Sequence, residues 1–83
     1  MTQDKTTEEQ VIEIVARVFH KEGTEINRDT RFIDDLFAKS INFVELFAVL
    51  EDELHLPSIP LSKARQMDTV GKAIDLVVNL LDK

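Results

Sequence analysis

Imidazole, carboxylate and hydroxyl groups are the reactive side chains of this sequence, because its 83 residues include no cysteine. The chain therefore has no thiolate, no disulfide and no cysteine-based metal site. His20 and His55 lie in separate segments, and no nucleophile and base stand at a readable spacing around either. The adjacent acids Asp34 and Asp35 are typical of turns, and the acids do not match the EF-hand spacing. The sequence predicts no catalytic residue and no metal site, so we expect the protein not to be an enzyme.

Ser40 is the hydroxyl with the most informative position. It stands where a long connection gives way to a helical pattern, and by position alone it is predicted to be a helix N-cap, a role that serine often takes. The start of a helix also favours an anion, because free backbone N–H groups and the helix dipole point towards it. A phosphodiester on this hydroxyl would keep its charge in solvent. Neither observation alone selects a function.

Three stretches have the apolar spacing of amphipathic helices that would position this serine. No stretch alternates apolar and polar residues for long enough to predict a strand. The three apolar stripes are Val11, Ile14, Val15, Val18 and Phe19; Phe43, Leu46, Phe47, Leu50 and Leu54; and Val70, Ala73, Ile74, Val77, Val78 and Leu81. We therefore expect an all-α fold, a four-helix bundle of three longer helices and one short helix.

The first helix is predicted to start near residue 7, after a capping box of Thr6 and Glu9, and to stop near residue 21 at Gly23. Residues 22–39 then form a long connection without a regular period. Connections of this length in small domains are often functional loops. We expect its apolar residues to pack onto the helices: Ile26, Phe32, Ile33, Leu36 and Phe37.

Proline and capping residues set the other predicted limits. Pro57 closes the second helix, and Asp68 or Thr69 is available to cap the last one. Between them, Ser62 is predicted to cap a short helix that ends at residue 66. The predicted order is thus helix, long loop, helix, short helix and helix.

The net charge of −6 is concentrated around Ser40. Residues 29–53 hold seven acidic and two basic residues, which gives a net charge of −5. Glu45 and Asp52 lie seven positions apart and share a face of the second helix, with Glu51 and Glu53 beside them. One interpretation is a solvated helix face. The other is a docking strip that attracts and orients basic partner surfaces.

Size and composition exclude several classes of function. A chain of this length forms one domain, predicted over residues 1–83, and its core is too thin for a deep active site. The acidic balance argues against a nucleic-acid binder, which needs clustered Lys and Arg. The longest apolar run, residues 46–50, is too short to span a membrane, and residues 1–10 lack the apolar core of a secretory signal. We therefore expect a monomer in the cytoplasm.

The segment around Ser40 resembles the attachment region of acyl carrier proteins. Residues 34–46 read D-D-L-F-A-K-S-I-N-F-V-E-L and residues 50–54 read L-E-D-E-L; the family typically reads D-L-G-x-D-S-L-x-x-V-E-L with a similar ending. Residues 59–60, I-P, and residues 69–75, T-V-G-K-A-I-D, are similar to later stretches of the family. The resemblance covers almost the whole chain. It implies the family's four-helix bundle, in which a long loop joins the first two helices.

This resemblance implies a role for Ser40. A phosphopantetheinyl transferase would transfer 4′-phosphopantetheine from coenzyme A to its hydroxyl, and the thiol of that arm would hold an acyl group as a thioester. The chain would deliver the group to acyl-transferring, condensing or modifying enzymes of fatty-acid, polyketide or related specialised biosynthesis. In the family an acyl chain can fold back into the bundle. Here the residues that would line such a cavity, or simply form the core, are Phe43, Leu46, Phe47, Leu50, Ile59, Leu61, Val70 and Ile74.

A docking face beside the arm is also implied. Its residues in this chain are Asp35, Lys39, Ile41, Glu45 and Asp52. Three positions depart from the family pattern: Lys39 replaces an aspartate, Ile41 a leucine and Phe37 a glycine. Lys39 stands at a helix start, where a cation is disfavoured by about 0.3–1 kcal/mol, and it would repel a basic partner. The Phe37 ring would contact the arm or a partner, or would pack under the loop. These departures favour a specialised carrier.

A different class of function stays open from the residues alone. The chain would then be a small helical adaptor that is never modified and that docks basic partners through its acidic second helix. Ser40 would only cap that helix. The mass of the protein after incubation with coenzyme A and a transferase separates the two hypotheses.

Overall fold

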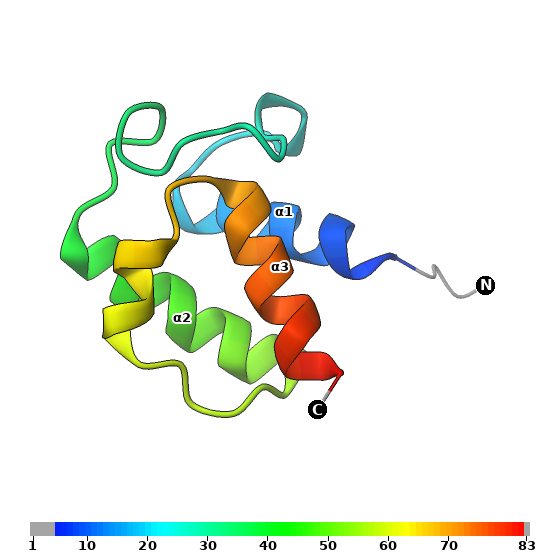
Figure 1. Cartoon of the computed structure of the whole chain (residues 1–83). Helices are drawn as coiled ribbons and strands as arrows, with labels where there is room; N and C mark the ends of the chain where they lie inside the picture. Colours follow the sequence, from blue (N-terminus) through cyan, green and yellow to red (C-terminus); the bar gives the residue numbers. More distant parts are fainter. Residues whose placement is uncertain (1–4, 83) are drawn as a thin grey trace.

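Three α-helices and two short 3₁₀ helices make up the computed structural model, which describes residues 5–82 and so leaves the ends of the predicted domain outside. In chain order they are α1 (Thr7–Val18), η1 (Gly23–Glu25), α2 (Ser40–Leu54), η2 (Leu61–Gln66) and α3 (Val70–Leu81) (Figure 1). The described range contains no β-strand, and one isolated bridge pairs Arg31 with Thr69. The predicted all-α fold is confirmed. None of the helices in residues 5–82 is long and apolar enough to cross a membrane.

Helix α1 begins as its sequence predicts. The Thr6 hydroxyl accepts the backbone N–H of Glu9 at 3.1 Å, and the Glu9 carboxylate accepts the backbone N–H of Thr6 at 2.9 Å. This reciprocal pair is the predicted capping box, which satisfies two N–H groups at the helix start. The helix then buries four residues of its predicted stripe: Val11, Ile14, Val15 and Val18.

The end of α1 differs from the prediction. The helix stops at Val18 because His20 adopts the left-handed conformation, with a φ of 59°. The Lys21 N–H then turns back to the Ala16 carbonyl at 2.8 Å, which is the bond of a Schellman motif. The prediction that Gly23 stops the helix is therefore wrong, and Gly23 begins η1 instead.

Helix α2 starts at Ser40, but Ser40 is not its N-cap. Lys39 occupies that position with extended backbone, and its N–H donates to Oδ1 of Asn42 at 2.8 Å. The predicted N-cap role of Ser40 is wrong because Asn42, inside the first turn, supplies the side-chain oxygen that closes it. At the other end, His55 is left-handed with a φ of 55°, so the helix ends before Pro57 is reached.

The third long helix is capped by Thr69 rather than Asp68, because the Thr69 hydroxyl accepts the Lys72 N–H at 3.3 Å. Its predicted stripe is buried up to Val77, whereas Val78 and Leu81 are exposed. The predicted short helix is the 3₁₀ helix η2. It follows Pro60 as N-cap, so the predicted cap Ser62 lies inside it.

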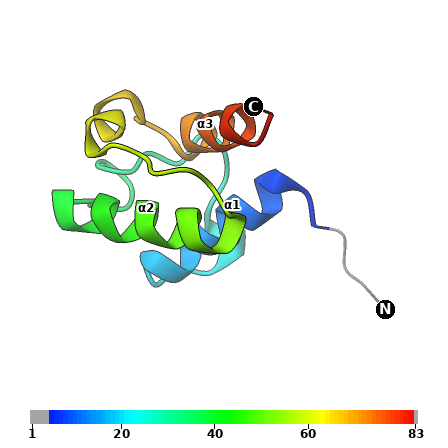
Figure 2. The same ribbon diagram turned by 90° about the horizontal axis from the view of Figure 1, so that it is seen from below.

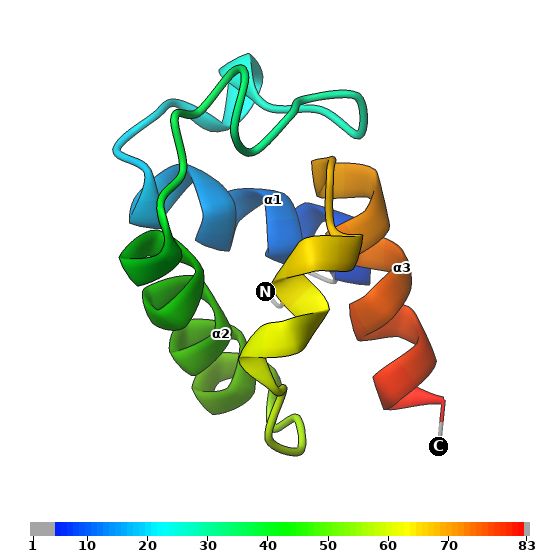
Figure 3. The same cartoon turned by 60° about the vertical axis from the view of Figure 1, so that its left-hand side comes forward.

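The long loop is anchored by alternate apolar residues and is tied to α3. Ile26, Phe32 and Leu36 are buried, whereas Ile33 and Phe37 are exposed, so the loop packs onto the helices as predicted but through three of its five apolar residues. The loop passes over α1 and reaches the N-terminal ends of α2 and α3 (Figures 1 and 3). Three backbone bonds fasten it to α3: Val70 N–H to Thr30 at 2.9 Å, Phe32 N–H to Asp68 at 3.1 Å, and Gly71 N–H to Arg28 at 2.9 Å.

Gly71 permits the last of these bonds. A Cβ at this position would lie 3.0 Å from the carbonyl oxygen of Arg28. This distance is tighter than most contacts of real Cβ atoms, so a larger residue would require the loop backbone at Arg28 to shift by a few tenths of an ångström. The T-V-G stretch at residues 69–71 thus joins a helix cap to a close loop contact.

Helix α1 packs against both α2 and α3, and η2 packs against α2. The connection from α2 to η2 runs below α2 in Figure 1 and faces the viewer in Figure 2. Phe32 of the loop packs beside the end of α1 and the start of α2: its ring centroid lies 6.0 Å from that of Phe19 and 5.3 Å from that of Phe43. The Phe43 ring in turn lies 6.3 Å from Phe47. A line of aromatic rings therefore connects the loop to the helix that carries Ser40.

Candidate functional site

The side chain of Ser40 is exposed at the first residue of α2. Because the Lys39 backbone and the Asn42 side chain cap the helix, the serine hydroxyl is not needed for that purpose. The helix start also presents backbone N–H groups and the positive end of the helix dipole to any anion bound there. The geometry fits a phosphodiester on Ser40 in solvent.

A hollow of about 450 Å³ opens beside this serine. Helix η2 forms its opposite wall, and the complete lining is Ser40, Phe43, Leu61, Ser62, Ala64 and Arg65. Arg65 is the one ionisable side chain of that lining, so the hollow offers a cation to a phosphate but no side-chain base. Sequence reasoning missed Ser62, Ala64 and Arg65 as site residues, because η2 comes to face Ser40 only through tertiary packing.

The eight residues predicted to line an acyl cavity are placed in two ways. Phe43 and Leu61 line the hollow beside Ser40, and the Leu61 side chain is 48% exposed. The remaining six are packed in the apolar core: Leu46, Phe47, Leu50, Ile59, Val70 and Ile74. Two of the eight predicted residues thus line the hollow, and the other six form part of the core.

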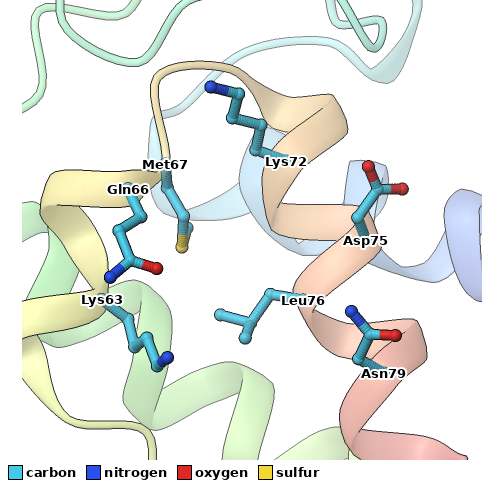
Figure 4. A pocket seen from close by; sticks show the side chains of 7 residues that line it. All are labelled: Lys63, Gln66, Met67, Lys72, Asp75, Leu76 and Asn79. Atoms are coloured by element: carbon cyan, nitrogen blue, oxygen red, sulfur yellow. The ribbon is translucent and has the colours of Figure 1, made fainter.

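A second hollow, of about 280 Å³, lies between η2 and α3 (Figure 4). Met67 and Leu76 point into it, and Lys63 and Lys72 stand at its margin (Figure 4). It shares no lining residue with the hollow beside Ser40, and it contains none of the predicted cavity residues. This hollow is therefore separate from the candidate attachment site.

The predicted docking residues fall into two groups. Lys39, Ile41, Glu45 and Asp52 are exposed along the loop end and α2, and the Ile41 side chain is 70% exposed. Asp35 is also exposed, but its Oδ2 accepts the Arg31 backbone N–H at 2.8 Å. Asp35 thus serves as a turn former, whereas the other four are available to a partner.

The acidic strip on α2 is narrower than its sequence suggests. Glu51 turns inward, and its Oε2 accepts the Ile59 backbone N–H at 2.7 Å. Glu53 pairs with the Arg17 guanidinium of α1, including a bond of 3.1 Å to Nη2. This hydrogen-bonded pair lowers the pKa of Glu53 and raises the pKa of Arg17. Glu45 and Asp52 are left as the exposed acids of the strip that take part in none of the ion pairs within residues 5–82.

The two histidines have structural positions. Each adopts the left-handed conformation after a long helix, His20 after α1 and His55 after α2. Such a residue stops a helix, and glycine is the usual choice there. Both side chains lie away from the hollow lining that contains Ser40.

Comparison with known proteins agrees with this geometry. The family model described as "Phosphopantetheine attachment site" matches residues 9–77, which includes α2 and η2 and most of α1 and α3. Two curated relatives, each called acyl carrier protein, come from strains ATCC 33277 and W83 of Porphyromonas gingivalis. Each is 39% identical to this chain over 70 residues, which covers 84% of this chain and 88% of the relative.

The geometry of the site and the comparisons lead to the same conclusion. Ser40 is exposed, and it lies at a helix start that suits a phosphate. The motif around Ser40, the all-α fold and the matched residues 9–77 agree over most of the chain. The group implied by this domain, covalent 4′-phosphopantetheine, supplies a thiol that the chain itself lacks. The chain belongs to the acyl carrier protein family, with 4′-phosphopantetheine as its prosthetic group.

Proposed function

We propose that this chain carries acyl groups as thioesters on 4′-phosphopantetheine attached to Ser40. As a cytoplasmic monomer it delivers them to partner enzymes of fatty-acid, polyketide or related specialised biosynthesis. The observation that carries the proposal is the position of Ser40: exposed, first in α2, and free of the capping role that Lys39 and Asn42 fill. Its place within the attachment motif supports the same assignment.

In this proposal the chain presents groups and catalyses no step. The Ser40 oxygen forms the bond to phosphorus, 3′,5′-ADP leaves from coenzyme A, and the hydroxyl proton passes to a base. That base belongs to the transferase, because the hollow beside Ser40 is lined by no carboxylate or imidazole. The start of α2 and the Arg65 guanidinium favour the phosphate once it is attached.

Intact mass tests the attachment site. The protein is incubated with coenzyme A and a broad-specificity phosphopantetheinyl transferase, and we expect one phosphopantetheinyl addition. Ser40→Ala should abolish the addition, whereas Ser62→Ala, in the same hollow, should keep it. If several transferases add nothing to the wild-type chain, the carrier function is wrong and the unmodified adaptor is favoured.

Lys39 gives a second test, because it stands beside Ser40 where the family has an acid. A transferase of the fatty-acid type, which docks acidic carriers through basic residues, should be repelled by this ammonium group. We therefore expect Lys39→Asp to speed modification by such an enzyme, measured as kcat/KM. An unchanged rate would count against this account of Lys39.

A further inference from the structure

Five exposed apolar residues belong to segments that lead to Ser40 or face it: the late part of the long loop, the first turns of α2 and the start of η2. We call the following five the Ser40 rim: Ile33, Phe37, Ile41, Val44 and Leu61, with exposed fractions of 65%, 75%, 70%, 47% and 48%. The other large apolar side chains exposed in residues 5–82 are Val78 and Leu81, in the last turns of α3 (Figure 1). An exposed apolar cluster with polar neighbours marks an interaction site. This one lies on the segments that lead to Ser40 or face it, and every partner of a carrier must approach Ser40.

Phe37 is the most unusual member of the rim. It is left-handed, with a φ of 56°, and its side chain is 75% exposed. A bulky residue in this conformation is strained, and such strain is typical of functional sites. The fold does not need the ring for packing, because Phe32 and Leu36 anchor this part of the loop.

The other left-handed residues provide a contrast. Among the described residues these are His20 and His55, and each stops a long helix. Phe37 stops no helix. Its N–H donates to the Ile33 carbonyl at 3.1 Å. This bond closes a turn that contains both Ile33 and the strained Phe37. The turn therefore presents the side chains of Ile33 and Phe37 to solvent, in the loop that leads to Ser40.

The one charged residue between Phe37 and Ile41 in the sequence is the cation Lys39, whereas the exposed acid Glu45 follows Val44 on α2. Lys39 lies between Phe37 and Ser40 and takes part in none of the ion pairs within residues 5–82. The nearby loop acids are engaged by Arg31: Asp34 accepts from its guanidinium at 3.2 Å, and Asp35 from its backbone N–H at 2.8 Å. A partner surface complementary to Lys39 carries carboxylates.

We propose that Phe37, with Ile33 and Ile41, is an aromatic anchor for partner enzymes whose docking face holds an apolar pocket flanked by carboxylates that pair with Lys39. The inference rests on the proposed function, because an enzyme that uses an arm on Ser40 must cover this rim. It differs from a docking mode in which basic residues grip the acids of α2. Aromatic side chains in a partner's pocket commonly contribute most to such contacts.

The phosphopantetheinyl transferase of the chain's own host is the probe, since it must dock at Ser40. Phe37→Gly removes the ring, and His55→Gly is the matched control, because it relieves the same backbone strain at the far end of α2. We expect both variants to melt about 2–6 °C higher than the wild type. The kcat/KM for transfer should fall about tenfold or more for Phe37→Gly and stay unchanged for His55→Gly.

Lys39→Gln tests the charge of the partner. With the same host transferase, kcat/KM should fall at low salt, and its difference from the wild type should shrink at high salt because ions screen the attraction. A rise in kcat/KM for Lys39→Gln would show basic groups on the partner and overturn the proposed pocket.

The outcomes distinguish a failure of the proposed anchor from a failure of the proposed carrier function. If the wild-type chain is modified and Phe37→Gly reacts as fast as His55→Gly, the anchor is wrong and the carrier function stands. If the wild-type chain receives no phosphopantetheine at Ser40, the carrier function fails and the anchor fails with it. If the rate falls for Phe37→Gly alone while both variants melt higher, the anchor is supported.

Discussion

The two ends of α2 use their polar groups differently. At the C-terminal end, Glu51 bonds the Ile59 backbone and Glu53 pairs with Arg17, so both acids hold the fold together. At the N-terminal end, the Ser40 hydroxyl is not the cap, and Lys39 joins no ion pair of the described residues. The acids Glu51 and Glu53 at the C-terminal end thus stabilise the fold, whereas the side chains of Lys39 and Ser40 at the N-terminal end are exposed.

The apolar residues show the same division. In the second half of α2, Leu50 is almost fully buried, whereas around Ser40 the side chains of Phe37, Ile41 and Val44 are exposed. The difference teaches that net charge alone does not locate a docking surface. Half of the acids that make α2 look like an acidic strip are engaged in the fold, and the exposed apolar cluster lies at the other end.

The largest expected effect separates two residues near the start of α2. Phe43 is 6% exposed and lies between the rings of Phe32 and Phe47, so Phe43→Ala should lower the free energy of unfolding by about 3–5 kcal/mol. Ile41→Ala, on the exposed face, should change it by less than about 0.5 kcal/mol. Urea unfolding measures both. Similar losses would mean that the exposed face also supports the fold.

Neighbouring acids at the other end of α2 provide the next test. Glu51→Ala leaves the N–H of the buried Ile59 without its acceptor and should cost about 1–3 kcal/mol of unfolding free energy. Asp52→Ala removes an exposed acid and should cost less than about 0.5 kcal/mol. Chemical denaturation of the two variants decides the matter. Equal costs would contradict the division of acids between fold and docking.

A smaller gain is expected at the residue that ends α2. His55 is left-handed, which costs an L-residue about 1–2 kcal/mol. His55→Gly should therefore raise the free energy of unfolding by about 0.5–1 kcal/mol, since glycine's extra backbone entropy offsets part of the relief. His55→Ala keeps the Cβ and should bring no such gain. Thermal melts of both variants provide the comparison.

The smallest effect is the pH dependence of the pair between Glu53 and Arg17. Arg17 lowers the pKa of Glu53 below its ordinary value of 4.5. The carboxylate therefore stabilises the fold above pH 4.5, and this contribution is lost as the pH falls through the lower folded-state pKa. Both side chains are exposed, so the effect is small and weakens with salt.

Melting curves of the wild type and Glu53→Gln between pH 7 and pH 3 measure this effect. The wild type should melt slightly higher at pH 7, and the difference should disappear at the acidic end of that range. A difference that stays constant across this range would show that the Glu53 charge is not its cause.

The helices were predictable because their signals are local. The capping box of Thr6 and Glu9 and the stripe that follows it act within a few residues of chain, and the structure confirms both. Caps were harder to predict where two candidates compete: Ser40 has a good cap side chain, but Asn42 closes that turn from inside the helix. The end of α1 was missed because His20, rather than a glycine, takes the left-handed position there.

The site was predictable in part. The residues around Ser40 indicated the attachment point through their resemblance to a family, and the exposed hydroxyl agrees with that position. The opposite wall of the hollow, with Arg65, was not predictable, because a 3₁₀ helix more than 20 residues away supplies it. The exposure of Ile33 was also missed and that of Phe37 was left open, since an irregular loop has no period that separates buried from exposed positions.

The sequence by itself determined the helices, the serine at the start of the second one, and an acidic chain without a thiol. These features depend on residue types and short spacings. Only the tertiary structure decided which charges are available, because Glu51 and Glu53 are engaged by residues distant in the chain. It also decided that Phe37 faces solvent, since Phe32 and Leu36 take the buried positions of the loop. The burial of a side chain and its pairing with another depend on contacts between distant segments, so no local sequence pattern predicts them.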